Sequence, residues 1–125
     1  MRFDKFTIKS QELIQQAQSL ASDHHHQQIE PEHLLQVMLA DPEGIVIAVM
    51  RKLDVSPTVV SQEILMSLSR SPRVTGTVDV YISQRTKSVL DAAFGESSAM
   101  KDQYVSIEHI LLAVSDKKKA KPPEF

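Results

Sequence analysis

Apolar residues recur with a helical period soon after the start of the chain. They lie at Leu13, Ile14, Ala17, Leu20 and Ala21, the spacing of a single helical face. Thr7 precedes them as a suitable N-cap, and a polar run at 24–28 follows them. The pattern therefore predicts an amphipathic helix that starts after Thr7 and ends near residue 23.

Three more helices follow in the first half of the sequence. Pro31 suits the first turn of a helix, because the missing N–H costs nothing there. Ser56-Pro57 predicts another helix start, by an N-cap followed by proline. Residues 45–53 are apolar nearly all round, which suits a buried helix or a strand; the helical period of the apolar positions favours a helix. The expected inward residues are Leu34, Leu35 and Met38 in one helix, Val46, Val49, Met50 and Leu53 in the next, and Val60, Ile64, Leu65 and Leu68 in the last.

The chain contains an internal repeat. The stretch that begins Ile29-Glu30-Pro31-Glu32-His33-Leu34 returns 76 residues later as Val105-Ser106-Ile107-Glu108-His109-Ile110, without a gap. The same offset places Thr7 on Ser83 and the apolar pair at 13–14 on that at 89–90. Two related segments predict two related helix groups that bury their apolar faces together.

The fold class that follows is all-α, a pseudo-two-fold tandem repeat of helices with a truncated second repeat. We assign residues 1–116 to one domain: repeat one at 1–70, a linker at 71–82 that can pair briefly as an extended segment, and repeat two at 83–116. Residues 117–125, a lysine run followed by prolines, are expected to be a disordered tail. We interpret the sequence as a fragment of a longer protein. The alternative is that the surface on which the two absent helices would pack is left exposed. That apolar surface would favour self-association.

Composition narrows the classes of function. A net charge of −2 gives no bulk field for nucleic acid or an acidic membrane, and no apolar run reaches the length of a membrane span. The absence of cysteine excludes disulfides and thiolate chemistry, and suits a cytoplasmic protein. The three glycines do not form a phosphate-binding loop, so we expect no cofactor in this chain.

Three polar motifs have a functional and a structural interpretation. Adjacent histidines at 24–26 converge poorly on a metal ion, so a solvated loop is favoured. Glu32-His33 and Glu108-His109 are adjacent pairs that do not face each other on a helix. We therefore expect them to cap a helix start or to pack between the repeats, rather than to catalyse a reaction. The lysine run at 117–121 lacks interleaved aromatics, which favours a solvated tail over a nucleic-acid contact.

Two packed helical repeats leave a groove between them, and an apolar groove beside polar helix N-termini commonly holds a peptide. We expect Leu13, Ile14, Leu90 and Phe94 to line this groove. On this hypothesis a polar replacement of Leu90 weakens peptide binding and leaves the helices intact.

Four sequence segments together resemble the N-terminal domain of ClpB/Hsp104-type AAA+ disaggregases. They are the opening at 1–7 (MRFDKFT), the segment at 17–21 (AQSLA), the stretch from Ile29 to Leu35 and its repeat at 105–114. The resemblance covers about residues 1–116.

The resemblance implies a pseudo-dimer of two four-helix repeats, tethered to two ATPase modules that use ATP and Mg²⁺ and assemble as a hexamer. It implies that the domain engages apolar segments of unfolded or aggregated polypeptides, and that the ring threads them with help from the DnaK system. A polar trio of the family corresponds to Thr7, Asp102 and Glu108, and its apolar groove to Leu90 and the surroundings of His109. Family members continue the second repeat for two more helices, where this chain has its lysine-rich tail.

Three other functions compete with substrate binding. The chain could dock a folded adaptor, as in the protease-coupled ClpA and ClpC. It could be an enzyme, although no nucleophile, base or metal constellation is visible in the sequence. It could also be a scaffold that only organises its own chain.

Overall fold

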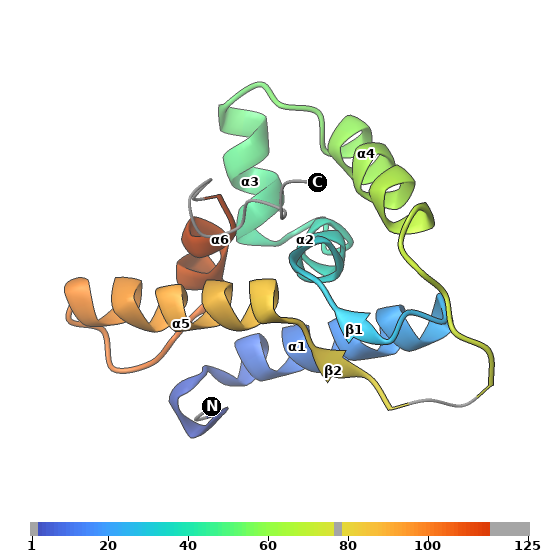
Figure 1. Ribbon diagram of the computed structural model, residues 1–125. Coiled ribbons are helices and arrows are strands. Elements are labelled where there is room, and N and C mark those ends of the chain that lie inside the picture. Colours follow the sequence, from blue (N-terminus) through green and yellow to red (C-terminus); the bar gives the residue numbers. More distant parts are fainter. Residues whose placement is uncertain (1–2, 77–78, 116–125) are drawn as a thin grey trace.

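The computed structural model describes residues 3–76 and 79–115, and Figure 1 shows two related helix groups built around a common centre. The all-α prediction is confirmed. The elements in chain order are η1 (Phe3–Lys5), α1 (Ile8–Asp23), β1 (Gln28–Ile29), α2 (Pro31–Leu39), α3 (Ile45–Lys52), α4 (Pro57–Ser69), β2 (Tyr81–Ile82), α5 (Gln84–Ala99) and α6 (Ile107–Ser115). The predicted lysine-rich tail lies outside the described residues.

Polar caps set the helix starts where the sequence predicted them. The hydroxyl of Thr7 accepts a hydrogen bond from the N–H of Ser10 (3.1 Å), and Ser83 caps α5 in the same way through Thr86 (3.1 Å). Ser56 caps α4, and Pro57 fills its first turn. Each cap satisfies a backbone donor that the helix itself leaves without a partner.

The first helix of each repeat also ends in the same way. His25 and Lys101 adopt left-handed backbone conformations, with φ of 59° and 58°. The next N–H groups return to the helix, from His26 to Ala21 (2.8 Å) and from Asp102 to Ser97 (2.9 Å). This reversal satisfies helix carbonyls. It also turns the chain back toward the start of α2 or α6.

Short extended segments join the repeats. β1 and β2 pair in parallel, with Gln28 beside Tyr81 and Ile29 beside Ile82. The symmetry-related bridge pairs Phe6 with Val105. These contacts hold the segment before each repeat's first helix against the segment before the other repeat's second helix (Figure 1).

Both repeats contribute to one core. Equivalent positions of the two repeats are buried in it: Leu13 and Val89, Ile14 and Leu90, Ala17 and Ala93, Ile29 and Val105, and Leu34 and Ile110. The ring of Phe6 meets that of Phe94 edge to face, at a centroid distance of 5.1 Å. Neither repeat could bury its apolar stripe alone, so burial in this shared core stabilises both.

The repeats differ beyond this core. In the first repeat α4 packs on α2, where Gln36 bonds to Ser61 (3.0 Å). The equivalent of Gln36 on α6 is Leu112, which is 48% exposed. Self-association through this surface stays a prediction. The prediction that Val49, Leu53 and Leu65 face inward is wrong, because all three side chains are exposed.

Replacing Thr7 with Ala is expected to lower the free energy of unfolding by about 1 kcal/mol, because the N–H of Ser10 loses its acceptor. Chemical denaturation monitored by circular dichroism measures this. Thr7→Ser keeps the hydroxyl and should retain most of the stability. Equal losses in both variants would exclude the cap as the cause.

Candidate functional site

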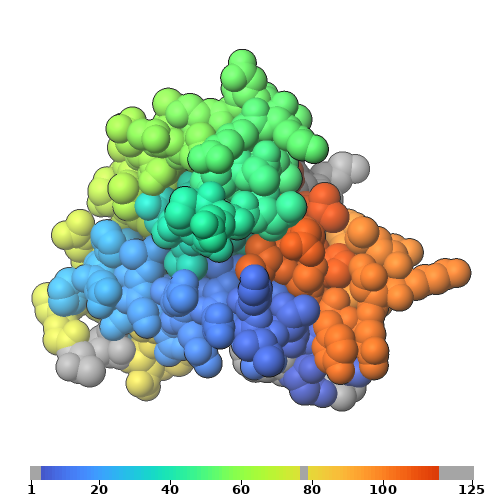
Figure 2. Space-filling model, turned by 180° about the vertical axis from the view of Figure 1, so that it is seen from behind, coloured from blue at the N-terminus to red at the C-terminus, as the bar shows by residue number. Residues whose placement is uncertain are grey.

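Three surface hollows follow one another along α1. The first, of about 350 Å³, lies at the N-termini of α1 and α6. The second, of about 170 Å³, lies between α1, α2 and α3 and shares Lys9 and Ile107 with the first. The third, of about 370 Å³, lies farther along α1 and shares Gln16 and Val37 with the second. We call these three neighbouring hollows together the α1 groove; Figure 2 shows the blue, blue-green and orange segments that meet there.

The lining of the α1 groove combines apolar side chains with a charged edge. The apolar residues come from all of its walls: Ile8, Leu13, Leu20, Val37, Met38, Ala40, Ile45, Val46 and Ile107. Lys9, Glu12 and Asp41 lie among them. Ile8 is 74% exposed and Ile45 is 44% exposed, so apolar surface is available without any movement of the chain.

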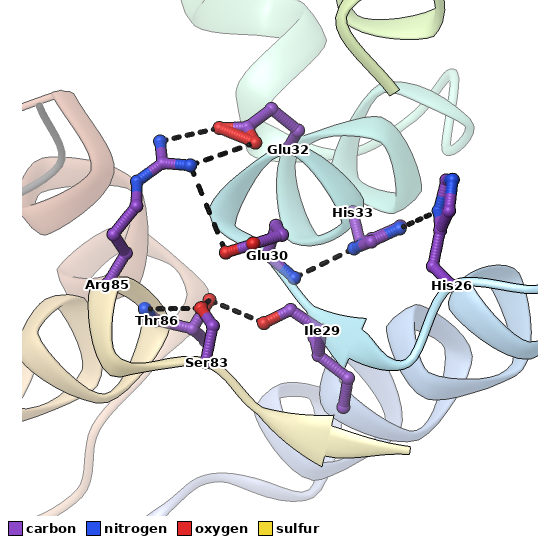
Figure 3. A network of polar contacts seen from close by, with 8 residues as sticks. All are labelled: His26, Ile29, Glu30, Glu32, His33, Ser83, Arg85 and Thr86. Carbon is purple, nitrogen blue, oxygen red and sulfur yellow. Dashed lines mark hydrogen bonds and ion pairs between the residues drawn. The ribbon is translucent and has the colours of Figure 1, made fainter. Parts of the chain in front are cut away.

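One end of the groove exists because two equivalent junctions are closed differently. Where α5 meets α2, Arg85 bonds to Glu32 (2.8 Å) and lies 3.9 Å from Glu30 (Figure 3). Where α1 meets α6, the equivalent residues are Lys9 and Glu108, and both line an open hollow. A planar guanidinium can hold two carboxylate oxygens at once, whereas an ammonium is a compact and strongly hydrated charge.

The residues predicted from sequence divide into three groups. Thr7, Leu13 and Glu108 line the α1 groove. Ile14 and Leu90 are buried in the shared core, and Phe94 is partly buried against it. Leu90 is 0% exposed, so it offers no surface to a peptide. The expected seam between the repeats is filled by its own side chains, and the open groove lies beside it.

Asp102 and His109 form a separate contact away from the groove. The Nε2 of His109 lies 2.8 Å from the Asp102 carboxylate, and its Nδ1 accepts a hydrogen bond from the N–H of Ser106 (2.9 Å). His109 therefore ties the start of α6 to the end of α5. The implied trio is not brought together here, since Asp102 pairs with His109 instead of lining the groove with Thr7 and Glu108.

His33 occupies the equivalent position in the first repeat. Its Nδ1 accepts from the N–H of Glu30 (2.8 Å), and its Nε2 lies 3.0 Å from Nδ1 of His26 (Figure 3). The structural interpretation is confirmed for Glu32, which bonds between the repeats, and for His33 and His109, which bond to their own helix starts. The solvated loop predicted for residues 24–26 is wrong for His26, which is buried.

Burial is the main cause of the pKa shifts of these two rings. It lowers the pKa of His33 from 6.5 to about 4, and the charges of His26 and His24 act in the same direction. Burial also lowers the pKa of His26, followed by His24 and Arg73, while Leu68 and Glu30 oppose the shift. Both rings are therefore neutral near pH 7.

No sequence pattern marks Ile8, Lys9, Ile45 and Ile107 directly as groove residues. Periodicity identified the apolar stripe that enters the core, and Ile8 stands outside that stripe. Single exposed apolar residues are common on protein surfaces. Such a residue indicates a binding surface only when other elements of the fold place further apolar side chains beside it.

Residues 3–76 and 79–115 show neither a metal-binding cluster nor a membrane-spanning helix. Within this part of the chain, no three histidine, aspartate or glutamate side chains are placed to hold a metal ion. None of the helices described there is long and apolar enough to cross a membrane.

Known proteins share both the sequence and the fold. Residues 5–122 match the Clp repeat (R) N-terminal domain family. The chain is 34% identical over 122 residues to the chaperone protein ClpB of Bacillus cereus, covering 94% of this chain and 14% of the relative. It is 37% identical over 114 residues to ClpB of Porphyromonas gingivalis, covering 91% of this chain and 13% of the relative.

Solved structures show the same fold at lower identity. The N-terminal domain of Hsp104 from Candida albicans superposes with a TM-score of 0.83 at 22% identity, covering 94% of this chain and 77% of that one. A complex of the ClpV N-domain with a VipB peptide has a TM-score of 0.82 at 24% identity, covering 96% and 74%.

Leu90→Ala is expected to lower the free energy of unfolding by about 2–5 kcal/mol, because it leaves a cavity in the shared core. Leu65→Ala is the matched control, since Leu65 is exposed on α4 and should change stability by less than about 0.5 kcal/mol. Urea denaturation of both variants decides between a core and a surface role. Similar small losses would place Leu90 on the surface in solution.

Acid is expected to destabilise the fold between about pH 6.5 and pH 4. In the unfolded chain the pKa of His33 is 6.5, whereas in the folded chain it is about 4. The contribution of neutral His33 to the free energy of unfolding is therefore complete above pH 6.5, and it is lost as the pH falls from 6.5 to 4. The full shift corresponds to about 3 kcal/mol. Denaturation at several pH values measures it for the chain and for His33→Gln. A pH dependence that is identical in both proteins would contradict the assignment to His33.

Proposed function

Since the chain belongs to the Clp repeat (R) N-terminal domain family, we propose that it engages substrate for an ATP-dependent protein disaggregase. On this proposal the α1 groove binds exposed apolar segments of unfolded or aggregated polypeptides. The observation that carries the proposal is an open groove lined by apolar side chains, of which Ile8 and Ile45 are exposed to a ligand.

The dimensions of the groove suit a short peptide segment. α1 has 16 residues and is therefore about 24 Å long, a distance spanned by about seven residues of extended chain. The apolar lining favours apolar side chains of any shape, and the charged edge can bond to a peptide backbone. Such a surface binds weakly and tolerates many sequences, as transfer of a substrate to a motor requires.

The remaining parts of the proposal come from relatives. The chain spans about 14% of the length of the ClpB relative from Bacillus cereus, so the ATPase modules, ATP and Mg²⁺ belong to the proposed parent protein. The hexamer and cooperation with DnaK belong to the same proposal. Peptide binding by this fold is supported by the ClpV N-domain complex with a VipB peptide.

The same complex favours a second candidate function. A domain that carries a peptide of one named partner can serve as a docking site for that partner. On this alternative the α1 groove recognises a single adaptor or target sequence. A tight complex with one protein of fixed stoichiometry would support it, whereas weak binding of many unfolded chains supports substrate engagement.

Replacing Ile8 and Ile45 together with Ser is expected to weaken binding of an unfolded polypeptide about tenfold, because the groove loses two apolar contacts. Fluorescence anisotropy with a labelled, reduced and carboxymethylated secretory protein measures the dissociation constant. Both side chains are exposed, so the thermal midpoint should change little.

Val59→Ser is the matched control, since Val59 is 51% exposed on α4 and lies outside the groove. It should bind the unfolded chain as the unmodified domain does. Equal affinities for all three proteins would remove the α1 groove as the binding surface.

A further inference from the structure

The two repeats close the same corner of the fold with different chemistry. In the first repeat His33, at the start of α2, contacts His26. In the second repeat the equivalent His109, at the start of α6, contacts Asp102. These partners occupy equivalent positions after equivalent left-handed residues. From this difference we propose that the His26–His33 contact is a proton-operated latch, which opens one junction of the domain in mild acid while the Asp102–His109 contact stays closed.

The hydrogen bonds leave the first pair no free site for a proton. Nδ1 of His33 accepts from the N–H of Glu30, so its own proton is on Nε2, which donates to Nδ1 of His26. Each lone pair of the two acceptor nitrogens is therefore already used. A proton added to either nitrogen would face another donor, and one of the two bonds must break.

The surroundings of the pair do not compensate for a charge. His33 is 0% exposed and His26 is 3% exposed, so an imidazolium at either position would be poorly solvated. The titratable and charged neighbours come from three segments: His24 beside the end of α1, Glu30 before α2, and Arg73 in the 71–76 segment. The His24 ring stacks on that of His26 at 5.7 Å, and of these neighbours only Glu30 favours the protonated state.

The latch ties the loop at 24–29 to α2, and the segment at 71–76 is bonded to that loop next to His26. The N–H of Val74 donates to the carbonyl of His25 (2.9 Å), directly beside His26. A hollow of about 300 Å³ already separates Ser71, Pro72 and Val74 from His26, Glu30 and His33. Water can enter there once the pair breaks, so opening starts at this junction.

Protonation of Nδ1 of His109 displaces the N–H of Ser106 from that nitrogen, but it leaves the contact with Asp102 in place. His109 donates from Nε2 to the Asp102 carboxylate, which a positive ring strengthens. The hydroxyl of Ser106 lies 3.0 Å from Nδ1 and can accept from that nitrogen when it is protonated. The equivalent of Ser106 in the first repeat is Glu30, which bonds to the His33 ring through its backbone N–H.

Amide hydrogen exchange by NMR at pH 7 and pH 5 tests the latch, with each rate divided by the intrinsic exchange rate at the same pH. The protection of the Val74 amide should fall at least about tenfold at pH 5, the effect of one proton bound about 1.4 kcal/mol more tightly in the open form. The Val105 amide, which donates to Lys5 three residues after Asp102, should change less than about twofold on the same scale.

His26→Asp reproduces the chemistry of the second repeat and should abolish the acid loss at Val74. Asp102→His is the reciprocal variant and should create an acid loss at Val105. Constant Val74 protection in the unmodified domain overturns the latch, and so does an equal loss at both amides. If His26→Asp does not fold, the unmodified domain and Asp102→His still decide. Peptide binding is not needed in any arm, so the result is independent of the proposed function.

Discussion

The structure depends on the backbone hydrogen bonds that hold the start of each repeat against the other. Thr7 donates its N–H to Val105 (2.9 Å), and Ser83 donates its N–H to Ile29 (3.2 Å). The same two residues cap α1 and α5 with their hydroxyls. Their backbone groups must find partners when they are buried, and each finds one only in the opposite repeat. This requirement fixes the register in which the two apolar stripes meet, and hence the shared core.

Function, on our proposals, arises where this symmetry is broken. Arg85 and Glu32 close one junction between the repeats, while Lys9 and Glu108 leave its counterpart open as the end of the α1 groove. In the described structure both junctions have backbone hydrogen bonds between the repeats, but only the junction of α5 and α2 also has this ion pair. Apolar side chains beside the open junction can therefore remain exposed without loss of the fold, which is the condition for reversible peptide binding.

The sequence predicted most of the local structure and little of the surface. Thr7, Ser56 and Ser83 marked helix starts because the chemistry of a cap is local. Leu90 shows the limit of the same reasoning: a helical period identifies a buried face, but the identity of what covers that face is a property of the packed chain. The groove was therefore predicted in the seam between the repeats, although it lies beside that seam along α1.

The order of caps, prolines and apolar positions by itself determined the four helices of the first half of the chain, and the repeat determined that a second, related helix group packs with them. The sequence could not show whether Thr7, Asp102 and Glu108 lie together. The turn after α5 places Asp102 against His109, seven residues later in the chain. Only the tertiary structure decided which histidine faces a carboxylate and which faces another histidine. Hydrogen-bond partners and burial depend on how the turns place the chain in space, whereas helix formation depends on neighbours within a few residues.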